Sequence, residues 1–230
     1  MFRGFTPESV EFLWGIRFNN ERPWFEAHKQ QYLSLIQEPL RQLGVEVQQE
    51  VAKRHPGRPF NLHVSRIYRD ARRLHGRGPY KDHMWIVLHS PAREGNGSSV
   101  PAFYFELAPE YYSIGMGYYS ATPLVMAKLR ARMDRDPKPM ERLARSLKKQ
   151  EQYVLEGEVY RRPKGEKGAL LDPWYNRKNI AIAWDRPCGG SLFERTVLHE
   201  IADGIDFLMP YFDYFSTLDA DPEPNTPQNE

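Results

Sequence analysis

The chain has 230 residues, of which 40% are hydrophobic and 27% charged, as expected of a globular protein. Its one cysteine, Cys188, excludes an internal disulfide and a cysteine-based zinc site, and the net charge of +2 is too small to indicate a polyanionic partner. Because no run of about 18 apolar residues is present, we expect a cytoplasmic protein with no membrane partner.

Two helices are predicted at the N-terminal end of the sequence. Thr6 and Pro7 are a typical N-cap and first helical residue, and this helix should end near Phe18. A second helix should begin near Pro23 and bend or divide at Pro39. Its apolar side chains recur every three or four residues, as on one buried helix face. They are Phe25, Tyr32, Ile36, Leu40, Leu43, Val47 and Val51.

Strands are predicted in the middle of the sequence. Residues 63–68 and 84–89 are short candidates. Residues 103–107 alternate between apolar and polar side chains, and residues 111–119 alternate again, as in half-buried strands. Because only residues 108–110 separate these two segments, they should pair as an antiparallel hairpin.

Helices and strands mix in the second half. Thr122-Pro123 and Asp136-Pro137 each predict the start of a helix with a basic outer face. Residues 158–162 and 180–184 are further strand candidates. This order of segments predicts an α+β fold, with a central, mostly antiparallel sheet and helices packed from both the N-terminal and C-terminal ends.

The last long helix is predicted from a capping box formed by Ser191 and Glu194. Its apolar residues are Leu198, Ile201, Ile205 and Leu208. We expect a single globular domain over residues 1–218, and the composition of residues 219–230 indicates a disordered acidic tail.

The densest group of polar residues lies between residues 65 and 83. Its cations are Arg66, Arg69, Arg72, Arg73, Arg77 and Lys81. Arginine matches the oxygens of a phosphate or carboxylate two at a time, and loops at the rim of a sheet often bind ligands. We therefore expect a small anionic ligand here. The candidate binding residues are Arg66, Tyr68, Arg69, Asp70, Arg72, Tyr80, Lys81 and His83.

Whether catalysis accompanies binding stays open at this point. Only Tyr68, Asp70 and His83 in this segment could move a proton. The same arginines could instead pair with carboxylates of the fold or of an acidic partner, which would make the protein an interaction or structural module without a small ligand. In that case, removal of Arg69 should lower stability instead of binding.

Gly115 and Gly117 are two further candidate binding residues, because they share one face of a predicted strand and leave room for a ligand or another backbone. The segment resembles a dinucleotide fingerprint, but Ser120 replaces its third glycine. The surrounding segments also do not alternate strand and helix as a doubly wound fold does. We predict no cofactor.

No metal site is predicted. His199-Glu200 with Asp203 resembles half of a zinc protease helix, but these side chains lie opposite the apolar residues of the helix, where solvated residues belong. The spacing of His63, His83 and His89 does not enforce a shared metal.

Nucleic-acid binding is a weaker alternative. The best candidates lie on the second of the two basic helices. They are Arg142, Arg145, Lys148 and Lys149. Acidic residues are interleaved with them, which favours a solvated helix face.

Several motifs resemble an uncharacterised bacterial and fungal family, domain of unknown function 2461. They are Phe5-Thr6-Pro7-Glu8, Asn19-Asn20, Trp24-Phe25-Glu26, Arg66-Ile67-Tyr68-Arg69-Asp70-Ala71-Arg72, Pro79-Tyr80-Lys81, Gly115-Met116, Pro123-Leu124, Arg162-Pro163-Lys164-Gly165 and Lys178. The likeness extends from Phe5 to about Phe215. It implies one cytoplasmic domain, and it supplies no catalytic role that can be carried over to this chain. Many relatives carry lysines just before the Pro-Tyr-Lys, where this chain has Arg77. Since arginine does not deprotonate, the difference favours charge recognition over a lysine nucleophile.

Overall fold

The computed structural model of the chain describes residues 1–70, 72, 76, 78–91, 100–118 and 120–224. The chain divides into two compact units, which are described separately. Unit 1 comprises Met1–Pro91, Phe103–Ile114 and Asp185–Asp206. Unit 2 comprises Ala92–Ala102, Gly115–Trp184 and Phe207–Glu230. Because several elements contribute residues to both units, this division does not test the predicted single domain, which stays a prediction.

Six strands form one sheet in the order β1-β2-β3-β4-β6-β5. They are β1 (Asn61–Val64), β2 (Met84–His89), β3 (Pro101–Leu107), β4 (Tyr111–Tyr118), β5 (Val154–Glu156) and β6 (Ala181–Pro187). The pairs β1–β2, β2–β3 and β5–β6 are antiparallel, and the amide of Ala108 donates to the Tyr111 carbonyl at 2.9 Å across the turn of the β3–β4 hairpin. The predicted α+β fold is confirmed, with helices toward both ends of the chain.

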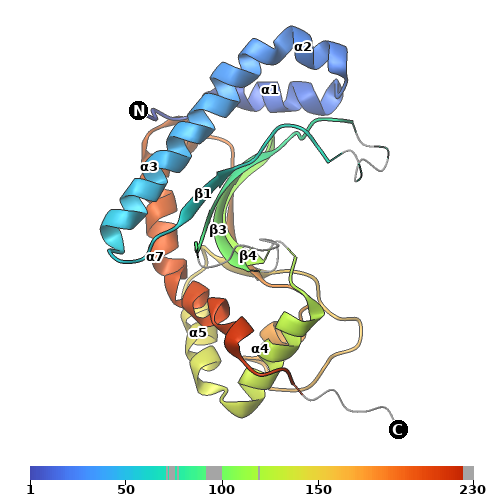
Figure 1. Ribbon diagram of the computed structural model, residues 1–230, viewed down its shortest axis with the longest axis vertical. Helices are drawn as coiled ribbons and strands as arrows, with labels where there is room; N and C mark the ends of the chain where they lie inside the picture. Colours follow the sequence, from blue (N-terminus) through green and yellow to red (C-terminus); the bar gives the residue numbers. More distant parts are fainter. Residues whose placement is uncertain (71, 73–75, 77, 92–99, 119, 225–230) are drawn as a thin grey trace. The chain divides into compact units, whose positions relative to one another are not determined.

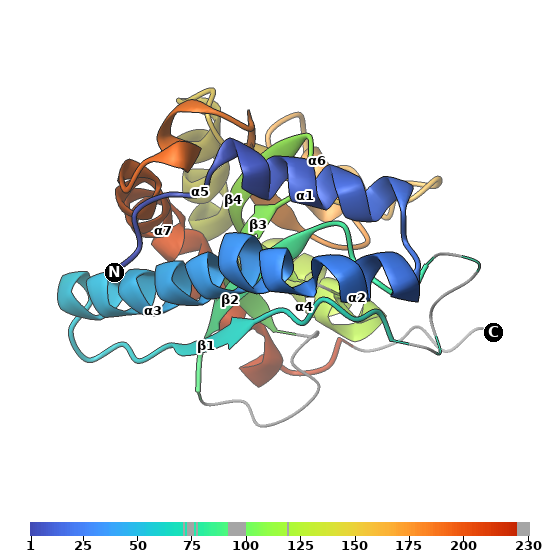
Figure 2. The same ribbon diagram turned by 90° about the horizontal axis from the view of Figure 1, so that it is seen from above.

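The N-terminal helices belong to unit 1 (Figures 1 and 2). They are α1 (Pro7–Phe18), α2 (Arg22–Gln31), the π-helical turn η1 (Tyr32–Gln37) and α3 (Glu38–Arg54). The second helix was predicted to bend or divide at Pro39. In the structure it is interrupted by the π-helical turn η1, and Pro39 lies just after this turn, at the start of α3. Helix α3 packs closely on the sheet at Gly44, where a Cβ would lie 2.9 Å from Leu62 Cδ1.

The side chains of strand β2 alternate between the two faces of the sheet in unit 1. Met84, Ile86 and Leu88 are buried, whereas the alternate residues Trp85 and Val87 are only partly buried. The same alternation continues on β3. Because α3 covers the face of Leu62 and Ile86, Trp85 and Val87 lie on the opposite face.

Unit 2 contains α4 (Pro123–Arg135), α5 (Lys138–Lys148) and the short α6 (Asp172–Tyr175). The Thr122 hydroxyl accepts from the Val125 amide at 3.2 Å, as expected of its N-cap. The prediction of a strand over residues 158–162 was wrong. Strand β5 ends earlier, because the backbone turns at Gly157, whose φ is 116°, and Val159 forms only an isolated bridge.

The last long helix, α7 (Thr196–Ser216), begins later than predicted. Gly190–Phe193 form a separate 3-10 turn, η4, so the Ser191–Glu194 capping box was wrong. The Ser191 hydroxyl instead donates to Glu200 Oε2 at 2.9 Å, and Arg186 Nη1 donates to Glu200 Oε1 at 2.7 Å. This network holds Ser191 away from the first turn of α7. The predicted apolar residues of the helix are buried: Leu198, Ile201, Ile205 and Leu208.

Two acidic residues near the C-terminus contact α4 within unit 2. The carbonyl of Asp219, in the 3-10 turn η5 (Leu218–Ala220), accepts from Lys128 Nζ at 2.7 Å. Asp221 Oδ2 accepts from Arg132 Nε at 2.6 Å. The remainder of the predicted tail, residues 225–230, lies outside the described residues. Within the described part of the chain, every helix is too short or too polar to span a bilayer.

Candidate functional site

The candidate segment is folded back on itself in unit 1. The Arg69 amide donates to the Pro79 carbonyl at 2.8 Å, and the Lys81 amide donates to the Ile67 carbonyl at 2.7 Å. These bonds place Tyr68 opposite Tyr80 in an antiparallel bridge. The sequence-predicted residues at the two ends of the segment are therefore held together. Arg73 and Arg77, two of its predicted cations, lie outside the described residues.

The two tyrosines of this bridge have different environments. The Tyr80 ring is 3% exposed and stacks on Phe25 of α2, with centroids 4.1 Å apart. Tyr68 meets the same phenylalanine edge-on at 6.1 Å and is 54% exposed. Tyr80 therefore anchors the segment to α2, whereas Tyr68 faces solvent.

Asn20 fixes the backbone of Tyr80 from the other side. Its Oδ1 accepts from the Tyr80 amide and its Nδ2 donates to the Tyr80 carbonyl, each at 2.9 Å. Gly78 makes room for this contact, since a Cβ there would lie 2.2 Å from Asn20 Oδ1. In the sequence, Asn20 stood out only as part of a family motif, and its positioning role was missed.

Asp82 is the centre of an ion-pair cluster. It accepts from Arg17 Nε at 2.6 Å and from Arg69 Nη2 at 3.1 Å, and His83 Nδ1 lies 3.1 Å from the same carboxylate. Burial opposes ionisation, but the hydrogen bonds from Arg17 and His83 lower the pKa of Asp82 to about 2. Arg17 also pairs with Glu110. The Arg69 guanidinium is therefore committed to the fold, and it also donates from Nε to the Tyr80 carbonyl at 2.7 Å.

Asp70 and Arg72 form a second, local pair. Arg72 donates from Nε at 3.0 Å and from Nη2 at 2.8 Å to the two oxygens of Asp70, and the Arg72 amide donates to the same carboxylate at 3.0 Å. The Arg72 side chain is 88% exposed. This pair closes a turn at the surface and balances its own charge.

Lys81 and Arg66 are arranged differently from the other cations. Lys81 Nζ donates to the Arg66 carbonyl and lies 4.7 Å from the centroid of the Trp85 ring. Arg66 is exposed. Among the described residues, no carboxylate forms an ion pair with either side chain. Positive charge is therefore concentrated here without a carboxylate partner in the described part of the chain.

Burial and the concentration of positive charge lower the pKa of two groups, Lys81 and His63. Burial and the cations of Arg66 and Arg69 lower the pKa of Lys81. Burial, His89, Lys81 and Arg66 lower the pKa of His63, which lies opposite Val87 on β1. We call Arg66, Lys81, His63 and Trp85 the basic face.

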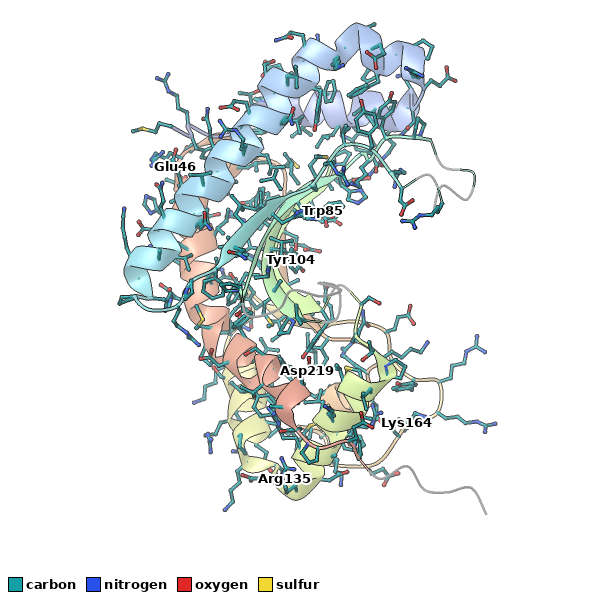
Figure 3. All side chains as sticks on the ribbon, in the orientation of Figure 1. Glu46, Trp85, Tyr104, Arg135, Lys164 and Asp219 are labelled. Atoms are coloured by element: carbon teal, nitrogen blue, oxygen red, sulfur yellow. The ribbon has the colours of Figure 1, made fainter. Side chains whose placement is uncertain are left out.

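Trp85, on β2, lies opposite an acidic residue of the neighbouring strand β3. Figure 3 labels Trp85 and Tyr104 on neighbouring strands. His83 stacks on Trp85 with centroids 5.5 Å apart, and Glu106 is the register partner of Trp85. Burial and then the Glu106 charge raise the pKa of Tyr111 to about 12, and the Tyr111 hydroxyl donates to Glu106 Oε1 at 3.2 Å. Sequence analysis missed Trp85, although its spacing from Lys81 and His83 repeats every second residue as on one strand face.

Gly115 and Gly117 lie in unit 2, on β4. A Cβ at Gly117 would lie 2.6 Å from the Ile180 carbonyl oxygen, and the Tyr118 amide donates to that carbonyl at 3.0 Å. The space that Gly117 leaves is thus filled by the neighbouring backbone at the start of β6, one of the two uses expected from the sequence. Gly115 is buried in the same strand.

The other candidate groups are dispersed or paired. Within the described residues, no three or more His, Cys, Asp or Glu side chains form a group that could hold a metal. In the zinc-like sequence, Glu200 pairs with Arg186 at 2.7 Å and Asp203 pairs with Arg54 at 2.6 Å. On α5, Arg145 pairs with Glu141 at 2.8 Å. Three of the nucleic-acid candidates are exposed without an ion pair among the described residues: Arg142, Lys148 and Lys149.

A family model described as conserved hypothetical protein (DUF2461) matches residues 8–214. The chain belongs to this family. The family suggested by the motifs is therefore confirmed, and the match includes both the candidate segment and the basic face. None of the curated proteins compared with the chain matches it. Since the family description names no reaction, function must be argued from the side chains themselves.

Proposed function

We propose that the protein binds a small molecule with a phosphate or carboxylate group at the basic face. One observation supports this proposal most directly. Lys81 and Arg66 lack a carboxylate partner among the described residues, whereas the neighbouring cations Arg69 and Arg72 are paired with Asp82 and Asp70. The segment therefore contains both structural cations and cations that remain available.

The arrangement of Lys81 favours an external anion. Its ammonium group is fixed by the Arg66 carbonyl and by the Trp85 ring, two partners that leave its positive charge uncompensated. Partial burial beside other cations disfavours a charged lysine, which is why its pKa is lowered. A bound phosphate or carboxylate would reverse this cost by supplying the opposite charge.

His83 is the candidate proton-transfer group if the ligand is also a substrate. It contacts Asp82 through Nδ1 and stacks on Trp85 beside the basic face. The pKa of Asp82 is about 2, so this carboxylate stays ionised near neutral pH. Asp82 would therefore orient His83 without exchanging a proton itself. This role is an extension of the binding proposal and depends on it.

Ligand-dependent melting tests the binding proposal. The protein is heated with a panel of phosphorylated metabolites, nucleotides and dicarboxylates at constant ionic strength. A ligand at a hundred times its dissociation constant adds about 2.7 kcal/mol, or roughly 5–10 °C in melting temperature. Arg66→Ala and Lys81→Ala should each abolish the shift.

Arg72→Ala is the matched control, because Arg72 belongs to the same segment but is paired locally with Asp70. It should keep the ligand-induced shift. A panel without any shift, or a shift that survives both Arg66→Ala and Lys81→Ala, would contradict the proposal.

The alternative, a structural or interaction role for the arginines, is favoured by one observation at Arg69. Its guanidinium contacts Asp82 and the Tyr80 carbonyl in a partly buried cluster. Arg69→Ala should therefore lower the melting temperature with or without a ligand. If instead the variant melts normally and loses only ligand binding, Arg69 belongs to the binding site.

A further inference from the structure

We propose a second anion site, in unit 2, that binds a terminal phosphate group between Arg130 and Lys164. Arg130 is on α4, and Figure 3 labels Lys164 on the loop between β5 and α6. Both cations approach the ring of Tyr160: Arg130 Cζ lies 5.7 Å and Lys164 Nζ 4.8 Å from its centroid. The site shares no residue with the basic face and does not depend on it.

Arg130 supplies the strongest indication of a missing partner. Its Nη1 is shielded from solvent, and no described residue accepts a hydrogen bond from it. A guanidinium group is always charged at physiological pH, and an N–H group without water or an acceptor is costly. An oxyanion beside Tyr160 would balance the charge of this guanidinium group.

The loop that carries Lys164 is organised around the side chain of Asn176. Asn176 is 9% exposed, and its Oδ1 accepts from the Lys164 amide at 2.6 Å while its Nδ2 donates to the Gly165 carbonyl at 3.0 Å. The Tyr160 amide donates to the Asn176 carbonyl at 2.9 Å. Tyr160 and Lys164 are thus held in place before a ligand arrives, which reduces the entropic cost of binding.

Two carboxylates near this loop are already occupied. Asp134, one turn after Arg130 on α4, accepts from Lys167 Nζ at 2.7 Å and from the Tyr175 hydroxyl at 3.0 Å. Glu158 pairs with Lys178 at 2.9 Å. In the described part of unit 2, neither Arg130 nor Lys164 forms an ion pair, so their charges remain available to a ligand.

The chemistry of the two cations favours phosphate. Arginine donates several N–H groups in one plane, lysine adds a compact charge, and a terminal phosphate has three oxygens that can meet both at once. A carboxylate has only two oxygens and a smaller charge. Arg161 and Arg162, both exposed, increase the positive charge of the same loop. The inferred ligand is therefore inorganic phosphate or a small phosphate monoester.

Amide NMR with inorganic phosphate tests the site. Phosphate is titrated against the full chain at constant ionic strength, with sodium chloride as the reference salt and acetate as the carboxylate control. The amides of Lys164 and Gly165 should shift with phosphate, and more weakly with acetate. Lys164→Ala, at an exposed position, should raise the dissociation constant at least tenfold without affecting the fold. Arg130→Gln should do the same where it folds.

Two further variants separate this site from the others. Arg145→Ala removes an exposed cation of unit 2 that is paired with Glu141, and it should bind phosphate normally. Arg66→Ala with Lys81→Ala should also keep the shifts at Lys164 and Gly165, even if the basic face no longer binds. The inference is overturned if chloride reproduces the phosphate shifts, if no shifts occur near Lys164, or if Lys164→Ala binds phosphate like the native chain.

Discussion

Replacing Asp82 by Asn tests the ion-pair cluster that supports the candidate segment. The change keeps the size of the side chain but removes the negative charge that Arg17 and Arg69 share. Asp82 is only 16% exposed, so solvent can replace that charge only in part. We expect Asp82→Asn to destabilise the folded protein at neutral pH.

The magnitude follows from the pKa of Asp82, which falls from its ordinary 3.8 to about 2. At about 1.36 kcal/mol for each pKa unit, the ionised form contributes about 2 kcal/mol to the free energy of unfolding. For a chain of this length, such a loss should lower the melting temperature by about 4–8 °C. Because the pKa is lowered on folding, this contribution is complete well above pH 4 and is lost as the pH falls toward 2.

The assay is urea unfolding of the native chain and Asp82→Asn at pH 7 and pH 3. The difference between the two should fall to about half at pH 3, where the native carboxylate has begun to lose its advantage. Glu38→Gln is the matched control, since Glu38 also accepts from an arginine, Arg41, but at an exposed position. The control should unfold at the same urea concentration as the native chain.

Two results would refute this reasoning. One is an Asp82→Asn variant that unfolds at the native urea concentration at pH 7. The other is a difference of the same size at pH 7 and pH 3, which would mean that the carboxylate charge is not what stabilises the cluster.

Three other predictions test individual contacts. Asn20→Ala removes both hydrogen bonds to the Tyr80 backbone and should cost about 1–3 kcal/mol in urea unfolding, whereas a native value would show that these bonds contribute little. Burial raises the pKa of Cys188 to about 11, so its alkylation at pH 8 should be roughly a hundredfold slower in the folded than in the unfolded chain; equal rates would contradict this. Glu106→Gln should lower the Tyr111 pKa from about 12 toward its ordinary value of 10 in an NMR titration, and an unchanged pKa would assign the effect to burial alone.

Strands and helix starts were predictable where the signal was local. Residues 84–89 are a short apolar run and residues 103–107 alternate in side-chain polarity, and both segments are strands. Thr122 caps its helix as expected, because the bond to Val125 spans only three residues. Such patterns depend on neighbours in the sequence, which are visible without a fold.

The failures involve partners that are distant in the sequence. Ser191 satisfies the capping-box pattern, but its hydroxyl also lies 3.0 Å from that of Tyr112, which comes from β4. The candidate segment shows the same limit: the charge of Asp82 was visible, but its partner Arg17 is 65 residues away. Sequence identified the segment with the relevant charges, whereas only the structure separates Arg69, which is paired, from Lys81, which has no carboxylate partner among the described residues.

The division of unit 1 into three stretches of chain has a consequence for its synthesis. Residues 1–91 leave the ribosome first, yet the last stretch ends only at Asp206. At about 5–20 residues per second, this interval lasts roughly 5–20 s. During that time Phe2 lacks Arg195, whose Nη1 donates to its carbonyl at 2.6 Å, and Phe5 lacks the Leu192 carbonyl, which accepts from its amide at 3.0 Å. Folding of unit 1 must therefore finish late, and a nascent chain that stalls before Leu192 would lack both contacts and leave its N-terminal segment open to chaperones and proteases.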